Sequence, residues 1–363
     1  MLADAAGAVL TVDLAALVAN WRLLCSLHPS GPVAGVVKGD GYGLGAAPIA
    51  EALFAAGCRH FFVALPQEAM AIRLRVPGAM VAVLSGLIPG TEDAFIVRDI
   101  TPVLGSLAEI DAWTAAGKRA GVRLPAILHV DTGMARLGLD QTAWHAVCQD
   151  PLRLAGIEVR YLLSHLVSSE IPTDPTNETQ RTRFASIRSA FPAIPGSFAN
   201  SSGIFLGPDW GSDLARPGAA LYGINPTPDR PNPMRPVVAL HARILSTRDI
   251  PAGTAVGYNA TWTATRPTRI ATAAIGYADG LHRAVSGRLT GFFDGTPIPL
   301  VGRVSMDLTT FDVTDCPAAE VGGWIEIIGP SQSPDAVAAV AGTNGYEVLT
   351  SLAPRLRRVY KPA

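Results

Sequence analysis

A lysine followed by a glycine-rich segment is the first feature of the sequence that could carry chemistry. Lys38 comes directly after the apolar run 33–37, which contains three valines, and four of the next seven residues are glycines. A valine-rich run predicts a strand buried on both faces, and the glycines predict where that strand ends. A lysine at the end of such a strand is held rigidly, and partial burial lowers the pKa of its amine, as Schiff-base chemistry requires. The alternative is a solvated lysine on a loop.

Further polar side chains occur at, or just after, other short apolar runs. They are His129, Asp131, Arg136, His165, Asn200, Ser201 and Arg216. Hydroxyl and backbone N–H groups such as those of residues 200–203 suit a phosphate cradle. The structural alternatives are a hydrogen-bonded core histidine at 165, a helix cap at 200–201 and an ion pair at 216. Their joint occurrence at the ends of predicted strands favours a catalytic site.

The elements that would position these side chains alternate between strand and helix along residues 9–221. Strands are predicted over 33–37, 61–65, 81–84, 101–103, 126–130, 159–164, 196–198 and 214–216, with helices that include 46–56, 66–75 and 178–190. This alternation predicts an α/β fold with an N-terminal (β/α)8 TIM-type barrel, whose active site lies at the carboxyl ends of the strands. The alternative is a doubly wound open sheet, but no GxGxxG motif follows the first strand.

Short β-rich segments separated by Gly, Pro and Asp turns make up the rest of the chain. Strands are predicted over 237–244, 269–275, 299–304, 308–313 and 324–328. They predict a second, mostly antiparallel β domain. We assign residues 1–230 to the barrel and 231–363 to the β domain, with the first residues of the chain as a candidate addition to the β domain. The proline-rich segment 226–236 is the predicted hinge.

Composition narrows the class of protein. The net charge of the 363 residues is -1 and no basic tract occurs, which disfavours nucleic acid as a partner. The uncharged stretch 76–91 contains two prolines and is too short to span a bilayer, and no basic residue precedes Arg22 as a secretory signal would require. The four cysteines are scattered without CxxC spacing. We expect a soluble cytoplasmic protein without a metal site.

Seven motifs, taken together and in order, resemble the alanine racemases, a family of fold-type III amino acid racemases that use pyridoxal 5′-phosphate. The motifs are VVKGDGYG (36–43), HVDTGMARLG (129–138), ANS (199–201), RPGAALYG (216–223), VGYNAT (256–261), IGYADG (275–280) and VGRVSMD (301–307). The resemblance covers almost the whole chain, including the predicted β domain. It implies a homodimer with shared active sites that interconverts L-alanine and D-alanine.

The resemblance implies a two-base mechanism. Lys38 would hold the cofactor as a Schiff base and act as the base on the D side. Tyr258, from the β domain of the other subunit of a head-to-tail dimer, would act on the L side. Since an ordinary tyrosine has a pKa of about 10, it needs a nearby cation or donor, a role that the resemblance gives to His165 and Arg216. The alternative for Tyr258 is an ordinary strand tyrosine.

The resemblance also implies the remaining roles. Arg216 would donate to the pyridine nitrogen, and because a guanidinium stays protonated, it would disfavour protonation of that nitrogen and weaken the ring as an electron sink. The other cofactor contacts would come from Tyr42, His165, Asn200, Ser201, Gly218, Ala219 and Tyr346. The substrate carboxylate would meet Arg136 and the backbone N–H of the partner's Met306. Glu170, Tyr277 and Arg303 would line the channel to the site.

One position departs from the family pattern. Many alanine racemases carry a carbamylated lysine where this chain has His129, and that negative group positions the arginine equivalent to Arg136. A histidine cannot supply a stable carbamate. Our hypotheses are a bound anion such as chloride beside Arg136, or reorientation of Arg136 through hydrogen bonding of His129.

Three alternative functions are weighed against alanine racemisation. A fold-type III decarboxylase would favour a carboxylate at the pyridine nitrogen, which Arg216 is not. A cofactor-binding barrel without turnover usually lacks the β domain. A serine or broad-specificity racemase stays open, because Gly39, Asp40 and Ser305 differ from common family residues. The sequence leaves open both D-alanine biosynthesis for peptidoglycan precursor supply and D-alanine catabolism.

Overall fold

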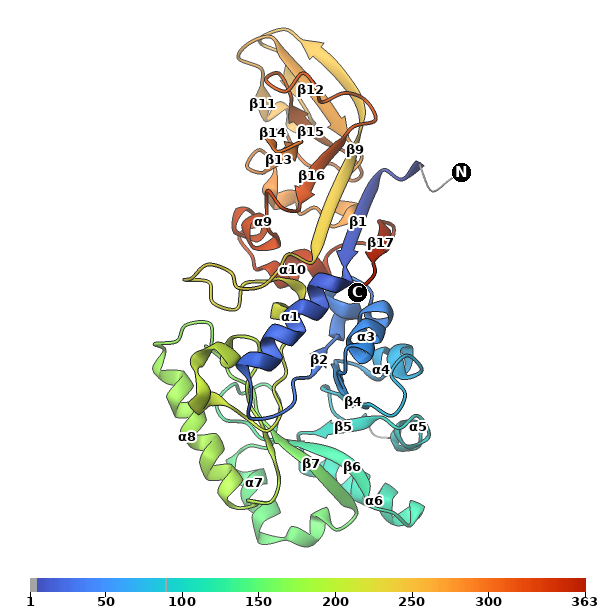
Figure 1. Cartoon of the computed structure of the whole chain (residues 1–363), viewed down its shortest axis with the longest axis vertical. Helices are drawn as coiled ribbons and strands as arrows, with labels where there is room; N and C mark the ends of the chain where they lie inside the picture. The colour runs from blue at the N-terminus through green and yellow to red at the C-terminus, as the bar shows by residue number, and fades with distance from the viewer. Residues whose placement is uncertain (1–4, 89) are drawn as a thin grey trace.

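The computed structural model describes residues 5–88 and 90–363. Residue 1, where the predicted barrel begins, and Pro89 of the uncharged stretch lie outside the described residues. Figure 1 shows an elongated molecule, with the parallel strands and their helices at one end and the β domain at the other. Within the described ranges, no helix is both long and apolar enough to cross a membrane.

The N-terminal part contains a seven-stranded sheet in which all neighbours run parallel and in chain order. Its strands are β2 (Gly35–Val36), β3 (His60–Val63), β4 (Met80–Val83), β5 (Thr101–Leu104), β6 (Leu124–His129), β7 (Ile157–Leu163) and β8 (Gly196–Ser197). The helices are α1 (Leu14–Leu27), α3 (Ala46–Ala55), α4 (Pro66–Arg73), α5 (Glu92–Val97), α6 (Leu107–Ala120), α7 (Gln141–Gln149) and α8 (Pro175–Ser189). The predicted strand–helix alternation is confirmed.

The eighth predicted strand, 214–216, is reduced to a single parallel bridge between Ala215 and Val33. The backbone N–H of Ala34 donates to the Ala215 carbonyl at 2.9 Å, and the N–H of Arg216 donates to the Ala199 carbonyl at 2.8 Å. This segment therefore bonds both to the first strand and to the chain just after β8. It cannot extend into a regular strand, since Pro217 follows and has no N–H to donate.

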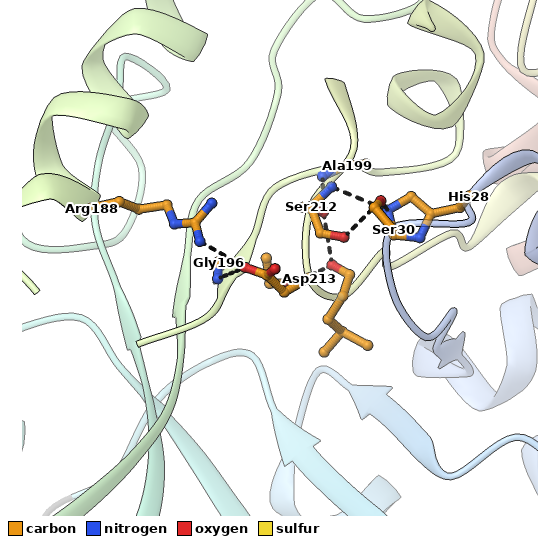
Figure 2. Close-up of polar contacts among 9 residues, drawn as sticks. His28, Ser30, Arg188, Gly196, Ala199, Ser212 and Asp213 are labelled. Atoms are coloured by element: carbon orange, nitrogen blue, oxygen red, sulfur yellow. Dashed lines mark hydrogen bonds and ion pairs between the residues drawn. The ribbon is translucent and has the colours of Figure 1, made fainter. Parts of the chain in front are cut away.

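Side chains hold this closing segment where a strand ladder is missing (Figure 2). Buried His28 accepts from the Ser212 N–H through Nε2 at 3.2 Å, and the Ser212 hydroxyl accepts from the Ala199 N–H at 3.3 Å. The Asp213 carboxylate accepts from the Gly196 N–H at 2.6 Å and from the Arg188 guanidinium at 2.7 Å. These contacts fix the residues that immediately precede Arg216.

Two apolar layers support the barrel. The inner layer fills the space between the strands with alternate, nearly solvent-free residues: Ala34, Val36, Phe62, Ala82, Val103, Ile127, Leu163 and Leu214. Strand residues that alternate with these, such as Phe61, Val81, Leu104, Leu128 and Leu162, belong to the main core. A barrel interior filled with side chains is a rigid base for groups at the strand ends.

The C-terminal part is an eight-stranded sheet in the order β12-β15-β14-β13-β16-β9-β1-β17, with an additional β12–β9 pairing. Its strands are β1 (Ala8–Asp13), β9 (Val238–Ile250), β12 (Thr268–Ala273), β13 (Thr290–Phe293), β14 (Thr296–Val301), β15 (Thr309–Asp312), β16 (Trp324–Ile328) and β17 (Arg357–Lys361). All pairs are antiparallel except β1 with β17. A small hairpin, β10 (Ala255–Val256) with β11 (Trp262–Thr263), and two helices, α9 (Pro334–Ala341) and α10 (Gly345–Thr350), complete it.

The two parts of the chain are joined by more than the connecting segment. The strand β1 lies between β9 and β17, and α1 follows it directly. From β17, Arg358 donates to the Gly43 carbonyl at 2.8 Å and Tyr360 donates to the Leu44 carbonyl at 2.9 Å. The β domain therefore contacts the loop that follows Lys38.

Candidate active site

A cavity of about 400 Å³ lies at the carboxyl ends of the parallel strands. It is lined by these residues that the sequence had singled out: Lys38, Tyr42, His129, Arg136, His165, Glu170, Asn200, Ser201, Arg216, Gly218, Ala219 and Tyr346. Sequence reasoning missed its apolar lining, which includes Val36, Phe62, Leu84 and Leu163. A second hollow of about 480 Å³ lies at the opposite ends of the strands and contains none of the predicted site residues.

Lys38 begins a left-handed turn. The φ angles of Gly39, Asp40, Gly41 and Tyr42 are 63°, 51°, 63° and 56°. Glycines adopt this conformation freely, whereas Asp40 and Tyr42 must be held in it by their surroundings. Burial, and next the charge of Arg136, lowers the pKa of the Lys38 amine, which enlarges its neutral fraction. A rigid lysine with a lowered pKa is suited to act as a nucleophile and as a base.

Arg216 is a buried cation held by the ends of two strands. It is 6% exposed, and it donates to the Ser197 hydroxyl and to the Ser164 carbonyl, both at 2.6 Å. Within the described part of the chain, no carboxylate lies in ion-pair distance of it. Burial lowers the pKa of Arg216 to about 9, so the side chain remains charged at neutral pH. The structural alternative for Arg216, an ion pair, is therefore not found among the described residues.

The two histidines of the cavity are neutral. Burial, and next the charge of Arg216, lowers the pKa of His165 to about 3 and that of His129 to about 4. His129 therefore supplies no negative charge to Arg136, which forms no ion pair with any described residue. The loop that carries Arg136 is fixed by Asp131, whose carboxylate accepts from three successive backbone N–H groups, residues 133–135.

One corner of the cavity is built around Ser201. Its hydroxyl accepts from the N–H groups of Gly218 at 3.0 Å and Ala220 at 3.2 Å. A Cβ atom at position 218 would overlap the hydroxyl of Tyr42, so only glycine fits there. Tyr42 stacks on Tyr222 with ring centroids 4.5 Å apart. Hydroxyls and backbone N–H groups that meet at the start of a turn suit a phosphate.

Two roles were considered for Asn200, a cofactor contact and a helix cap, and its position is compatible with both. Its Oδ1 atom accepts from the Gly203 N–H at 2.9 Å and from the Ser169 hydroxyl at 2.8 Å. Asn200 therefore caps the 3₁₀ turn Ser202–Leu206, and this cap was the structural alternative for Asn200. The same residue also lines the cavity.

The remaining predicted residues gather elsewhere, on the surface of the β domain. Tyr258, Tyr277, Arg303 and Met306 do not line the cavity, and residues Tyr258, Met306 and Tyr277 are 67%, 54% and 44% exposed. The Tyr277 N–H donates to the Ser305 carbonyl at 3.0 Å, which ties two of these segments together. A single chain thus carries the predicted site residues in two separate groups.

Two family models cover nearly all of the chain. The alanine racemase N-terminal domain matches residues 12–226, and the alanine racemase C-terminal domain matches residues 237–360. The chain belongs to the alanine racemase family. Most residues that line the cavity lie in the N-terminal match, and Tyr346 and the exposed β-domain group lie in the C-terminal match.

Individual alanine racemases match this chain along nearly its full length. The alanine racemase of Acidiphilium cryptum is 55% identical, covering 97% of this chain and 98% of the relative. A catabolic alanine racemase of Mesorhizobium japonicum is 48% identical over 98% of this chain and 94% of its own length. The crystal structure of the Bartonella henselae alanine racemase with covalently bound pyridoxal phosphate superposes with a TM-score of 0.95 at 40% identity, covering 98% of this chain and 100% of that one. The resemblance and the fold class expected from the sequence are confirmed.

Proposed function

We propose that this chain interconverts L-alanine and D-alanine with pyridoxal phosphate as its cofactor, and that two copies share each active site. The activity and the cofactor follow from family membership. The observation that supports the residue roles is that Lys38 and the Ser201–Gly218 corner line one cavity. Tyr258 lies outside that cavity on an exposed surface.

The residues of the cavity fit the cofactor. Among the lining residues, Lys38, Arg136 and Arg216 are cationic groups, and Glu170 is the single carboxylate. This imbalance favours a ligand with a phosphate group and a substrate with a carboxylate. A volume of about 400 Å³ lies within the range of small-molecule sites. Ser201, Gly218, Ala219, Tyr42 and Tyr346 would hold the phosphate, with Asn200 and His165 as further contacts.

When bound, pyridoxal phosphate withdraws electrons from the α-carbon of the amino acid and makes its proton removable. Lys38 would anchor the cofactor and then move a proton on the D face. Its lowered pKa favours the neutral amine that this role needs. Arg216, held from behind by Ser197 and Ser164, would oppose protonation of the ring nitrogen, because two like charges disfavour each other.

For the proton on the L face, we propose a base that comes from outside this cavity. Tyr258 is our candidate, supplied by the β domain of a second copy in a head-to-tail homodimer. Its exposure, together with that of Tyr277 and Met306, supports an interface, because large apolar side chains gathered on a surface are typical of one. Met306 would contribute its backbone N–H to the substrate carboxylate. Tyr277 and Arg303, with Glu170, would line the channel.

Arg136 would bind the substrate carboxylate directly. Since His129 is neutral and no described carboxylate pairs with Arg136, a small anion such as chloride is our candidate for the missing negative charge. Full activity in halide-free buffer, with no anomalous scattering beside Arg136 in bromide-soaked crystals, would remove that candidate.

We also propose a cytoplasmic location. All four cysteines are free thiols, and two of them are buried, which suits a reducing compartment. A fractionation experiment that found the protein outside the cytoplasm would contradict this.

The test of the function is α-proton exchange followed by NMR in deuterated water, with pyridoxal phosphate and L-alanine. Loss of the α-proton signal together with accumulation of D-alanine is the expected result. Exchange without inversion would contradict the role of Tyr258. No reaction with alanine but turnover of serine would favour the serine or broad-specificity alternative.

A further inference from the structure

The carboxylate of Glu68 binds four backbone N–H groups from two segments that are far apart in the sequence. Its Oε2 accepts from Ala64 at 2.7 Å and from Leu65 at 3.0 Å. Its Oε1 accepts from Gly39 at 2.6 Å and from Asp40 at 3.3 Å. Glu68 is the third residue of α4, where a glutamate ordinarily bonds the N–H that precedes the helix. That ordinary capping role accounts for Oε2 alone.

The second oxygen serves the left-handed turn that follows Lys38. Inside this turn, the Gly41 N–H bonds to the Val37 carbonyl at 2.8 Å, and the Gly43 N–H bonds to the Gly39 carbonyl at 2.7 Å. The N–H groups of Gly39 and Asp40 are instead bonded by Glu68. A strained turn persists only where its surroundings hold it, and Glu68 contacts its first two residues.

We propose that Glu68 is a positioning residue of the active site: its carboxylate fixes the turn that carries Lys38 and places a negative charge beside the lysine amine. This inference rests on the proposed role of Lys38. Glu68 does not line the cavity, so it acts through Lys38 and not on the substrate.

The negative charge of Glu68 opposes the other influences on the pKa of the Lys38 amine. Burial and the charge of Arg136 lower the pKa of Lys38, whereas Glu68 raises it and Arg216 lowers it further. A base must be neutral before it takes a proton and must still hold that proton afterwards. Glu68 therefore limits how far burial and the cationic groups of the cavity lower the pKa of Lys38.

The chain contains a matched control. Glu109 is the third residue of α6, and its carboxylate likewise accepts from loop N–H groups, those of Leu87 at 2.9 Å and Gly105 at 2.8 Å. Among the described residues, Glu109 makes no hydrogen bond to the Lys38 turn, and it does not line the cavity. The two variants E68Q and E109Q thus replace the same kind of capping carboxylate by an amide, and only the first alters the bonds to the turn that follows Lys38.

The experiment measures the Lys38 amine directly, because the chain contains only three lysines, at positions 38, 118 and 361. The full chain, freed of cofactor, is labelled with ¹³Cε-lysine and titrated by NMR, with Lys118 and Lys361 as internal references. We expect E68Q to lower the midpoint of Lys38 by at least about 0.5 pH unit, and E109Q to leave it unchanged.

Hydrogen exchange and kinetics complete the test. In E68Q, the backbone N–H groups of residues 39–40 exchange at least roughly 10-fold faster. The reason is that a glutamine side chain has a single acceptor oxygen and cannot bind both pairs of N–H groups. In the holoenzyme, kcat falls roughly 10- to 100-fold, with a smaller change in the KM for alanine. The variant E68D keeps the charge, so it restores the midpoint of Lys38 even where its shorter side chain lowers the rate.

Two results would overturn the inference: an unchanged Lys38 midpoint in E68Q, or equal changes in E68Q and E109Q. Should E68Q fail to fold, E68D and E109Q still decide, because an E68D chain whose amides at residues 39–40 exchange faster while its kcat stays at the wild-type value contradicts the positioning role. A wild-type chain that does not racemise alanine would defeat the proposed function, while the NMR and exchange measurements would still report on Glu68.

Discussion

The guanidinium of Arg216 donates to the hydroxyl of Ser197 at 2.6 Å, which links the buried cation of the cavity to the end of the last parallel strand. The same hydroxyl donates to the Leu214 carbonyl at 2.7 Å, two residues before Arg216. One serine thus holds both the charged group of Arg216 and the backbone that carries it. The closing segment lacks a regular ladder, so these contacts determine where the cation lies.

Replacing Ser197 by alanine tests this link. We expect S197A to lower the free energy of unfolding by about 1–3 kcal/mol, because a buried charged donor loses its acceptor. We also expect weaker cofactor binding, measured by fluorescence titration of the cofactor-free chain. Ser189→Ala, at an exposed position of α8, is the control and should change neither quantity. Wild-type cofactor affinity in S197A would contradict the positioning of Arg216 by Ser197.

The contact between Gly218 and Tyr42 yields a second prediction. G218A places a methyl group where the Tyr42 hydroxyl lies, so we expect cofactor affinity to fall at least roughly 10-fold. Combining it with Tyr42→Phe removes the overlapping oxygen, so the double variant should bind less weakly than the product of the two single effects predicts. Additive losses, measured by the same titration, would mean that the two residues do not share one binding corner.

The neutral histidines predict how stability depends on pH. The pKa of His165 is lowered to about 3 by burial and by Arg216, from 6.5 in the unfolded chain, so the unfolded chain binds more protons between these values. The free energy of unfolding should therefore fall as the pH drops below about 6.5, by up to about 1.4 kcal/mol per pH unit for this histidine. Urea denaturation at about pH 7 and about pH 5.5 measures the loss.

His165→Asn removes the titrating group from that comparison. We expect its loss of stability between the two pH values to be smaller than that of the wild type. His145→Asn, at an exposed position of α7, should lose as much as the wild type. An equal loss in all three chains would assign the pH dependence to other groups.

The proposed sharing of active sites predicts complementation between two inactive variants. A dimer of one K38A chain and one Y258F chain contains one site with both residues intact and one site with neither. Random pairing makes half of the dimers mixed, so activity should recover to about a quarter of the wild-type value. Mixing after mild dissociation and reassociation, followed by a racemisation assay, measures this. No recovery, despite mixed dimers shown by mass spectrometry, would contradict the shared site.

The sequence predicted those features that depend on short-range patterns. Lys38 and His165 follow apolar runs that form strands. Both residues line one cavity, because the carboxyl ends of parallel strands lie at the same edge of the sheet. Strand β16 was predicted with its observed bounds, because turn residues flank it on both sides. The motifs of the resemblance added the residues of the β domain, such as Tyr258, which no periodicity could assign.

Other features depend on contacts between distant segments. The closing segment 214–216 has the composition of a strand, but its length and Pro217 leave only one bridge. Strand β1 joins the β domain because it pairs with β9 and β17, which lie more than 200 residues later. The hydrogen-bond partners of Arg216, and the Gly39 and Asp40 N–H groups that Glu68 binds, are likewise far from these residues in the sequence. A glutamate at the start of a helix predicts a cap, and nothing in the sequence predicts a bond to Gly39.

Deuterium incorporation by Y258F tests the two-base arrangement most directly. L-alanine and D-alanine are incubated separately with this variant in deuterated water, and the α-proton of each is followed by NMR, with chirality determined afterwards. The arrangement predicts that D-alanine still exchanges through Lys38 without inversion, whereas L-alanine exchanges at least roughly 100-fold more slowly than with the wild type. Equal exchange of both enantiomers, or racemisation at the wild-type rate, would contradict the assignment of Lys38 and Tyr258 to opposite faces.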